Sequence, residues 1–158
     1  MKKLAYLAAV VLAGATGAAM AEEPSVELGA HIATIGGCHD CHTVGYAETG
    51  GKVDPATALQ GNPVGYAGPW GVTYAKNLRI TVSKMSEDDW ATFAKTFQVG
   101  PPMPWFNVHA MSELETRSLY LYIKSLGEAG PQAPDDVPPG GTIKTPYIVF
   151  APPQPPQG

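Results

Sequence analysis

The stretch CHDCH occupies residues 38–42, and Cys38 and Cys41 are the only cysteines in the 158-residue chain. His42 follows the second cysteine directly. Two thiols and an imidazole this close in sequence can bind zinc, form a redox dithiol or a disulfide, or attach haem covalently. The kind of fold that surrounds the motif depends on which of these chemistries applies.

Covalent haem attachment fits the motif best. A zinc site needs four nitrogen or sulfur ligands, and the chain has no second C-x-x-C or H-x-x-H pair to complete the shell. A redox dithiol is expected beside a βαβ pattern, which this sequence lacks. C-x-x-C-H is the haem signature, because two thiols about one helical turn apart can each add to a vinyl group. We predict that Cys38 and Cys41 tether one haem c and that His42 binds its iron; a disulfide or dithiol and then zinc are the less favoured alternatives. His39 and Asp40, between the cysteines, are expected to face solvent.

A second axial iron ligand is sought among the methionines and histidines. Met103 is the preferred candidate, since it lies in PPMPW (residues 101–105), where prolines restrict the backbone on both sides. Met111 and His109 are the alternatives. Most methionines fill cores, and Met111, which directly precedes a predicted helix cap, can be explained in that way.

The remaining pattern predicts three short helices and a long loop. Residues 25–35 have apolar positions at helical spacing after the potential cap Ser25 and stop at two glycines. Residues 43–82 are rich in glycine and proline and are expected to form an irregular loop that wraps the haem. Capping-box patterns at Ser86 and Ser112 start a helix of about ten residues and a helix that runs to about Leu126.

Both ends of the chain differ from the middle. Residues 1–21 have a basic start, an apolar run and a small-x-small end, which predicts a signal peptide cleaved near Ala21; an uncleaved membrane anchor is the alternative. Residues 128–158 hold nine of the sixteen prolines and are expected to be extended or disordered. Within them, TPYIVF (residues 145–150) is apolar enough to dock on residues 22–127, the predicted haem domain.

The charge balance limits the partners. The formal net charge is −4, and removal of Lys2 and Lys3 with the signal peptide would make it −6, because no acidic residue is lost with them. An acidic surface excludes nucleic acid as a partner and favours redox proteins that carry a basic docking patch.

The sequence resembles class I c-type cytochromes and is similar to the cytochrome c subunits or domains of periplasmic dehydrogenases. The similarity covers roughly residues 26–127 and includes YAKNL (74–78), MSEDDW (85–90), PPMPW and MSELETRSLYLYIKSL (111–126). It implies an all-α fold with a few short helices around one covalently bound haem, extended here by the Pro-rich tail. It also implies ligation by His42 and Met103, and a crossing of the first and last helices at Gly29 and Tyr122.

The resemblance also suggests further residues of the haem pocket. Trp70, Tyr74 and Asn77 are expected to donate hydrogen bonds to haem propionates or to pack against the porphyrin. Such domains often continue Thr-Pro after Asn-Leu, whereas this chain has Arg79-Ile80. Arg79 is therefore interpreted either as a partner of a propionate or as a surface charge.

Together these features predict a periplasmic electron carrier and not an enzyme. With both axial positions filled, iron can only cycle between Fe(II) and Fe(III), and no small-molecule substrate is expected. One alternative is a haem subunit of a dehydrogenase or oxidase complex, and membrane-bound complexes are among the candidates. The other is a five-coordinate haem enzyme or gas sensor with His109 as a distal base.

Overall fold

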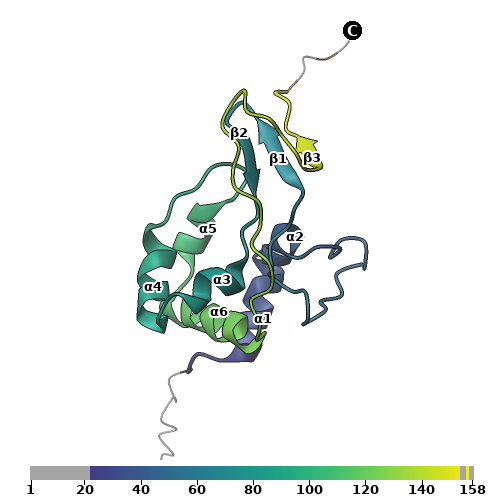
Figure 1. The fold of residues 1–158 in the computed structure, drawn as a ribbon. Helices are drawn as coiled ribbons and strands as arrows, with labels where there is room; N and C mark the ends of the chain where they lie inside the picture. The colour runs from purple at the N-terminus through teal and green to yellow at the C-terminus, as the bar shows by residue number, and fades with distance from the viewer. Residues whose placement is uncertain (1–21, 154–155, 157–158) are drawn as a thin grey trace, which may run out of the picture.

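The computed structural model describes residues 22–153 and residue 156 (Figure 1). The predicted signal peptide, residues 1–21, lies outside this part. The helices are α1 (Val26–Ile35), α2 (Cys38–His42), α3 (Leu78–Ser83), α4 (Glu87–Thr96), α5 (Trp105–Ala110) and α6 (Glu113–Ser125). The strands are β1 (Gly65–Gly68), β2 (Gly71–Tyr74) and β3 (Tyr147–Val149). In the described part of the chain, no helix has the length and apolar character needed to cross a membrane.

The first and last helices cross at a glycine. A Cβ atom on Gly29 would lie 2.0 Å from the carbonyl oxygen of Ser118 and 2.7 Å from Cβ of Tyr122, so the backbones of α1 and α6 are in direct contact. The backbone N–H of Ser25 also donates to the Ser118 hydroxyl, at 3.1 Å. The expected contact between Gly29 and Tyr122 is confirmed.

Helices α4 and α6 begin at capping boxes, as predicted. The Ser86 and Ser112 hydroxyls accept from backbone N–H groups three residues later, and the Asp89 and Glu115 carboxylates accept from the cap residues in return. The helices then pack on each other through Trp90, whose indole N–H donates to the Thr116 carbonyl at 3.0 Å. The main hydrophobic core forms where α1, α3, α4 and α6 meet.

The Ser112 cap allows a test of how much α6 depends on its start. Loss of a side-chain cap costs about 1 kcal/mol, so we expect Ser112→Ala to lower the free energy of unfolding by about that amount.

Hydrogen bonds from the backbone and side chain of Ser112 lower the pKa of Glu115 from its usual value of 4.5. A carboxylate whose pKa is lowered by folding stabilises the fold above its unfolded pKa and loses this effect as it becomes protonated. The difference in the free energy of unfolding between Ser112→Ala and the wild type, measured by urea unfolding, should therefore become smaller below about pH 4.5. Ser125→Ala, at the other end of α6, is the control and should change stability by less than about 0.5 kcal/mol.

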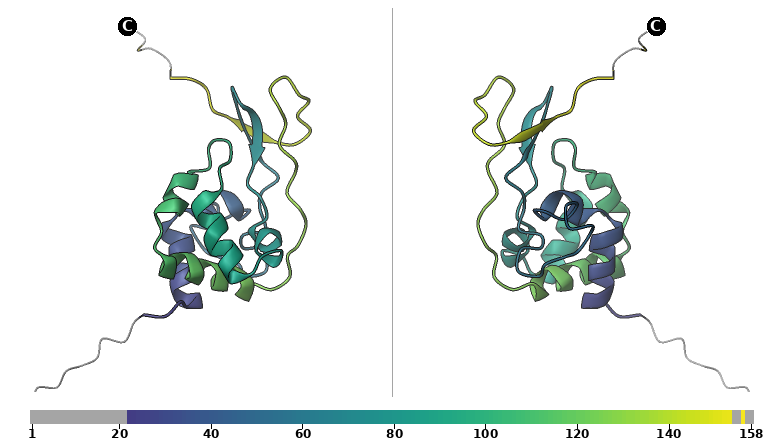
Figure 2. Two further views of the ribbon diagram at one scale, coloured as in Figure 1. Left: turned by 90° about the vertical axis from the view of Figure 1, so that its left-hand side faces the viewer. Right: turned by 90° about the vertical axis from the view of Figure 1, so that its right-hand side faces the viewer.

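The prediction of an all-α fold is wrong. Residues 65–74 form the hairpin of β1 and β2, and β3 adds parallel to β1, giving a three-stranded sheet in the order β2-β1-β3. Figure 2 shows the sheet at one end of the helical part. The strands have only three or four residues, too few to show an alternating pattern, and the glycines of the hairpin are equally typical of an irregular loop. Helices α3 and α5, of six residues each, also went unpredicted.

The chain after α6 runs back over the molecule (Figure 2). We call residues 128–150 the C-terminal strap. Val137 pairs with Val72 of β2, and Val137 and Ile143 pack on a small second core made by β1 and β2. The strap lies so close to β2 that a Cβ atom on Gly71, where φ is +95°, would be 2.1 Å from the Val137 carbonyl oxygen. Three residues of the TPYIVF stretch form β3, whose side chains are exposed.

Candidate functional site

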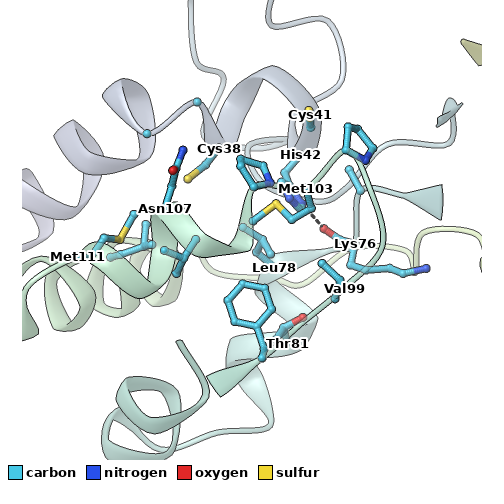
Figure 3. Close-up of a pocket in the computed structure, with 18 of the residues that line it drawn as sticks. Cys38, Cys41, His42, Lys76, Leu78, Thr81, Val99, Met103, Asn107 and Met111 are labelled. Carbon is cyan, nitrogen blue, oxygen red and sulfur yellow. Dashed lines mark hydrogen bonds between the residues drawn. The ribbon is translucent and has the colours of Figure 1, made fainter. Parts of the chain in front are cut away.

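A cavity of about 470 Å³ lies between the CHDCH helix and the segments that face it. Helices α1 and α2 line one part, and the opposite parts come from segment 73–81, the aromatic face of α4, and the chain from Val99 to Met111 (Figure 3). The lining is mostly apolar, and the volume lies within the range of small-molecule and cofactor sites, about 300–1,000 Å³.

The imidazole of His42 is buried in the cavity wall and held by the backbone. Its Nδ1 lies 2.7 Å from the Lys76 carbonyl oxygen, drawn as a dashed line in Figure 3. Because a carbonyl can only accept, Nδ1 carries the proton and the lone pair of Nε2 stays free. Burial lowers the pKa of His42, against the opposing effect of this hydrogen bond, so the ring is neutral at neutral pH. A neutral imidazole with its other nitrogen bound to a carbonyl is the arrangement found for metal-ligating histidines.

The two thiols lie in the same cavity wall, one helical turn apart on α2. Both cysteines are free and partly exposed, and α2 follows α1 after the turn at Gly36 and Gly37. Burial raises the pKa of Cys38 to about 11, and the charges of Asp40 and Cys41 raise it further against an opposing backbone hydrogen bond. The Cys38 thiol is thus protonated at neutral pH. Tyr66, a residue that sequence reasoning missed, also lines the cavity; burial, and after it the neighbouring Cys41, raise the pKa of its hydroxyl.

Two methionines line the cavity. Met103 comes from the loop between α4 and α5, which is fixed to β2 because the Thr73 hydroxyl donates to the Pro101 carbonyl at 2.5 Å. In Figure 3 the side chain of Met103 points into the cavity beside His42, whereas Met111 lies farther from His42, near Cys38. Met111 packs beside Gly36 and Cys38 and joins the main core.

His109 is not part of the lining. Its Nε2 lies 2.8 Å from the Phe97 carbonyl oxygen and therefore carries a proton, and its ring packs between Phe97 and Trp105. The position and hydrogen bond of His109 give it neither a free lone pair at Nε2 nor access to the cavity.

Of the other residues predicted for the pocket, only Tyr74 lines the cavity. Its hydroxyl bonds the hydroxyl of Thr145 at 2.7 Å. Trp70 packs on Phe150 at the far end of the sheet. Asn77 caps α3, and Arg79 is buried and donates only to backbone carbonyls. Trp70, Asn77 and Arg79 therefore lie outside the lining.

His39 occupies a different position from the one its sequence context indicates. It is buried, with Nδ1 2.8 Å from the Thr43 hydroxyl and its ring stacked on Tyr46. Burial lowers its pKa, the nearby Asp40 acting in the opposite sense. The prediction that His39 faces solvent is wrong, because the loop after α2 folds back over it; Asp40 is exposed, as predicted.

Sequence reasoning also missed most of the wall opposite α2. Phe93 and Phe97 stack on each other with ring centroids 4.9 Å apart, and both line the cavity with Trp90. The periodic aromatic face of α4 was visible in the sequence, but it indicated only that the helix packs against something. Lys76 gave no signal, because it contributes its carbonyl rather than its side chain.

The geometry gives no support to a zinc site. In residues 22–153 and 156, no three histidine, cysteine, aspartate or glutamate side chains converge as a metal site. The sulfur and nitrogen donors that share the cavity are two thiols, one neutral imidazole and two thioethers, and the carboxylates of Glu115 and Asp136 also line it. Such a set suits a large apolar group that is tethered through sulfur and ligated through its metal. No protein family, no curated protein and no solved structure matches this chain.

Proposed function

We propose that this protein is an electron carrier with one haem c, tethered through Cys38 and Cys41 and ligated by His42 and Met103. One observation carries the proposal: His42 presents a free Nε2 lone pair, its Nδ1 fixed by Lys76, in an apolar cavity that also contains both thiols and Met103. Bound haem would supply one-electron chemistry, its iron alternating between Fe(II) and Fe(III).

Each residue has a defined task in this proposal. The thiols of Cys38 and Cys41 would each add across a vinyl double bond, the sulfur to one carbon and the hydrogen to the other, so no oxidant would be required. His42 would hold the iron through the Nε2 lone pair, and Met103 would hold it through the thioether sulfur. The aromatic face of α4 excludes water, which favours the less charged reduced state.

The cellular setting is also part of the proposal. A signal peptide over residues 1–21 would deliver the protein to the periplasm, where a covalent cofactor cannot be lost by diffusion. The acidic composition favours brief, salt-sensitive encounters with basic patches on redox partners.

The intact mass of the exported protein after acid denaturation tests the tether. We expect the mass of residues 22–158 plus one haem, because thioether bonds survive denaturation. The double variant Cys38→Ser, Cys41→Ser should lose the added mass completely. A wild-type mass equal to that of the polypeptide alone would rule out the proposed function.

The choice between the two cavity methionines has its own test. Met103→Leu should abolish the visible and near-infrared features of His/Met ligation and lower the midpoint potential, because a thioether ligand raises it. Met111→Leu is the matched control, a substitution of equal size in the same cavity, and should keep the wild-type spectrum. The opposite pattern would assign the ligand to Met111.

A further inference from the structure

The C-terminal strap is fixed to segment 72–77 at two points. Near its start, the buried side-chain amide of Asn77 donates to two carbonyl oxygens of the strap, those of Ala129 and Pro131, at 2.5 and 2.8 Å. Farther along, Val137 and Val72 exchange two backbone hydrogen bonds of 2.8 Å. The strap therefore follows this segment along its length.

Asp136 lies between these two points. Its Oδ1 accepts from the Lys76 ammonium at 2.7 Å and from the backbone N–H of Tyr74 at 3.1 Å. The same ammonium also donates to the Pro134 carbonyl at 3.1 Å. A single carboxylate oxygen thus binds the first of the three residues from Tyr74 to Lys76 through its backbone and the last through its half-exposed ammonium, and Asp136 and Lys76 both line the cavity.

These three residues end at the carbonyl that holds His42. The Lys76 carbonyl oxygen lies 2.7 Å from Nδ1 of the imidazole, so a shift of the Lys76 peptide group changes that hydrogen bond directly. Partners of this kind set the orientation of a ligating histidine and its basicity. Lys76 therefore links the two groups: its ammonium contacts the Asp136 carboxylate, and its carbonyl contacts the imidazole of His42.

We propose that Asp136 is a positioning residue for His42, which acts through the Lys76 peptide group and makes the strap part of the cofactor site. This inference rests on the proposed function, in which His42 binds the haem iron. Without the Asp136 carboxylate, the ammonium of Lys76 and the N–H of Tyr74 lose their shared acceptor. The carbonyl then holds the Nδ1 proton less firmly, the imidazole becomes a weaker donor, and the ferric state loses stabilisation.

The experiment compares Asp136→Ala with Asp135→Ala in the haem-loaded protein. The two variants remove the same charge at adjacent positions, and the exposed Asp135 side chain makes no hydrogen bond or ion pair within the described part of the chain. One readout is the exchange rate of the His42 Nδ1 proton, measured by NMR; the other is the midpoint potential. We expect at least tenfold faster exchange and a higher potential in Asp136→Ala, and values close to wild type in Asp135→Ala.

Asp136→Asn extends the test and replaces the alanine variant if that variant does not fold. Its amide oxygen can still accept both hydrogen bonds but attracts the ammonium less, so exchange should be intermediate. If the Asp136 variants retain haem but have the same exchange rate of the His42 Nδ1 proton and the same midpoint potential as Asp135→Ala, the positioning role is refuted while the proposed function stands. If the wild-type protein carries no covalent haem, the proposed function itself fails, and the mass spectrum identifies that case.

Discussion

Replacement of Arg79 by methionine is expected to lower the free energy of unfolding by at least about 3 kcal/mol. Arg79 is only 4% exposed, and its guanidinium donates to the carbonyl oxygens of Ala58, Leu126 and Glu128 at 2.7 to 3.0 Å and to that of Pro55 at 2.5 Å. Methionine has similar length but no donor. A buried carbonyl left without a partner, such as that of Ala58, costs about 1–3 kcal/mol, and the three partly buried carbonyls add smaller losses. Guanidinium chloride unfolding measures the loss.

Arg117→Met provides the control for Arg79. Arg117 makes ion pairs with Glu87, Asp88 and Glu113, but these lie at the surface, where such pairs contribute about 0–1 kcal/mol. We therefore expect Arg117→Met to cost no more than about 1 kcal/mol. Equal losses in the two variants would show that Arg79 does not join loop 55–59 to the end of α6.

Alanine at position 29 is expected to destabilise the fold by about 3 kcal/mol, although alanine in place of glycine normally stabilises a helix by about 0.5–1 kcal/mol. The sign reverses because the new methyl group would lie 2.0 Å from the Ser118 carbonyl oxygen and 2.6 Å from its carbonyl carbon. These are backbone atoms, so the contact can be relieved only if α1 and α6 move apart.

Gly45→Ala separates this steric effect from backbone strain. Gly45 has a φ of +77°, and no atom lies within 4 Å of the position that its Cβ would take. The left-handed conformation alone costs alanine about 1–2 kcal/mol. Both variants are measured by thermal and denaturant unfolding, and a Gly29→Ala protein as stable as Gly45→Ala would contradict the crossing described above.

Local sequence patterns predicted the parts of the structure that short-range geometry controls. The capping boxes at Ser86 and Ser112 each need only residues within one helical turn, and both are present. The CHDCH spacing likewise places both thiols and His42 on one short helix, because the whole motif spans little more than a turn. Its assignment to haem stays a prediction with a decisive test in the intact mass.

Long-range pairing explains what the sequence did not indicate. Strand β3 pairs with β1 across about 80 residues of chain, and neither strand is long enough to show a period. The alternatives for Arg79, a propionate or solvent, both assumed that its partner carries charge or is water. Its acceptors are instead backbone carbonyls, which every residue has and which no sequence pattern distinguishes.

The sequence by itself determined which residues can supply sulfur and nitrogen donors and where α1, α4 and α6 lie, since composition, spacing and caps are local properties. Only the tertiary structure decided that Lys76 holds the imidazole of His42, that Asp136 of the strap holds Lys76, and that Met103 and Met111 share one cavity. The first two contacts join residues that are 34 and 60 positions apart, and the shared cavity needs several segments to pack together. They exist only once the helices and the strap have docked, so no pattern within a single segment can encode them.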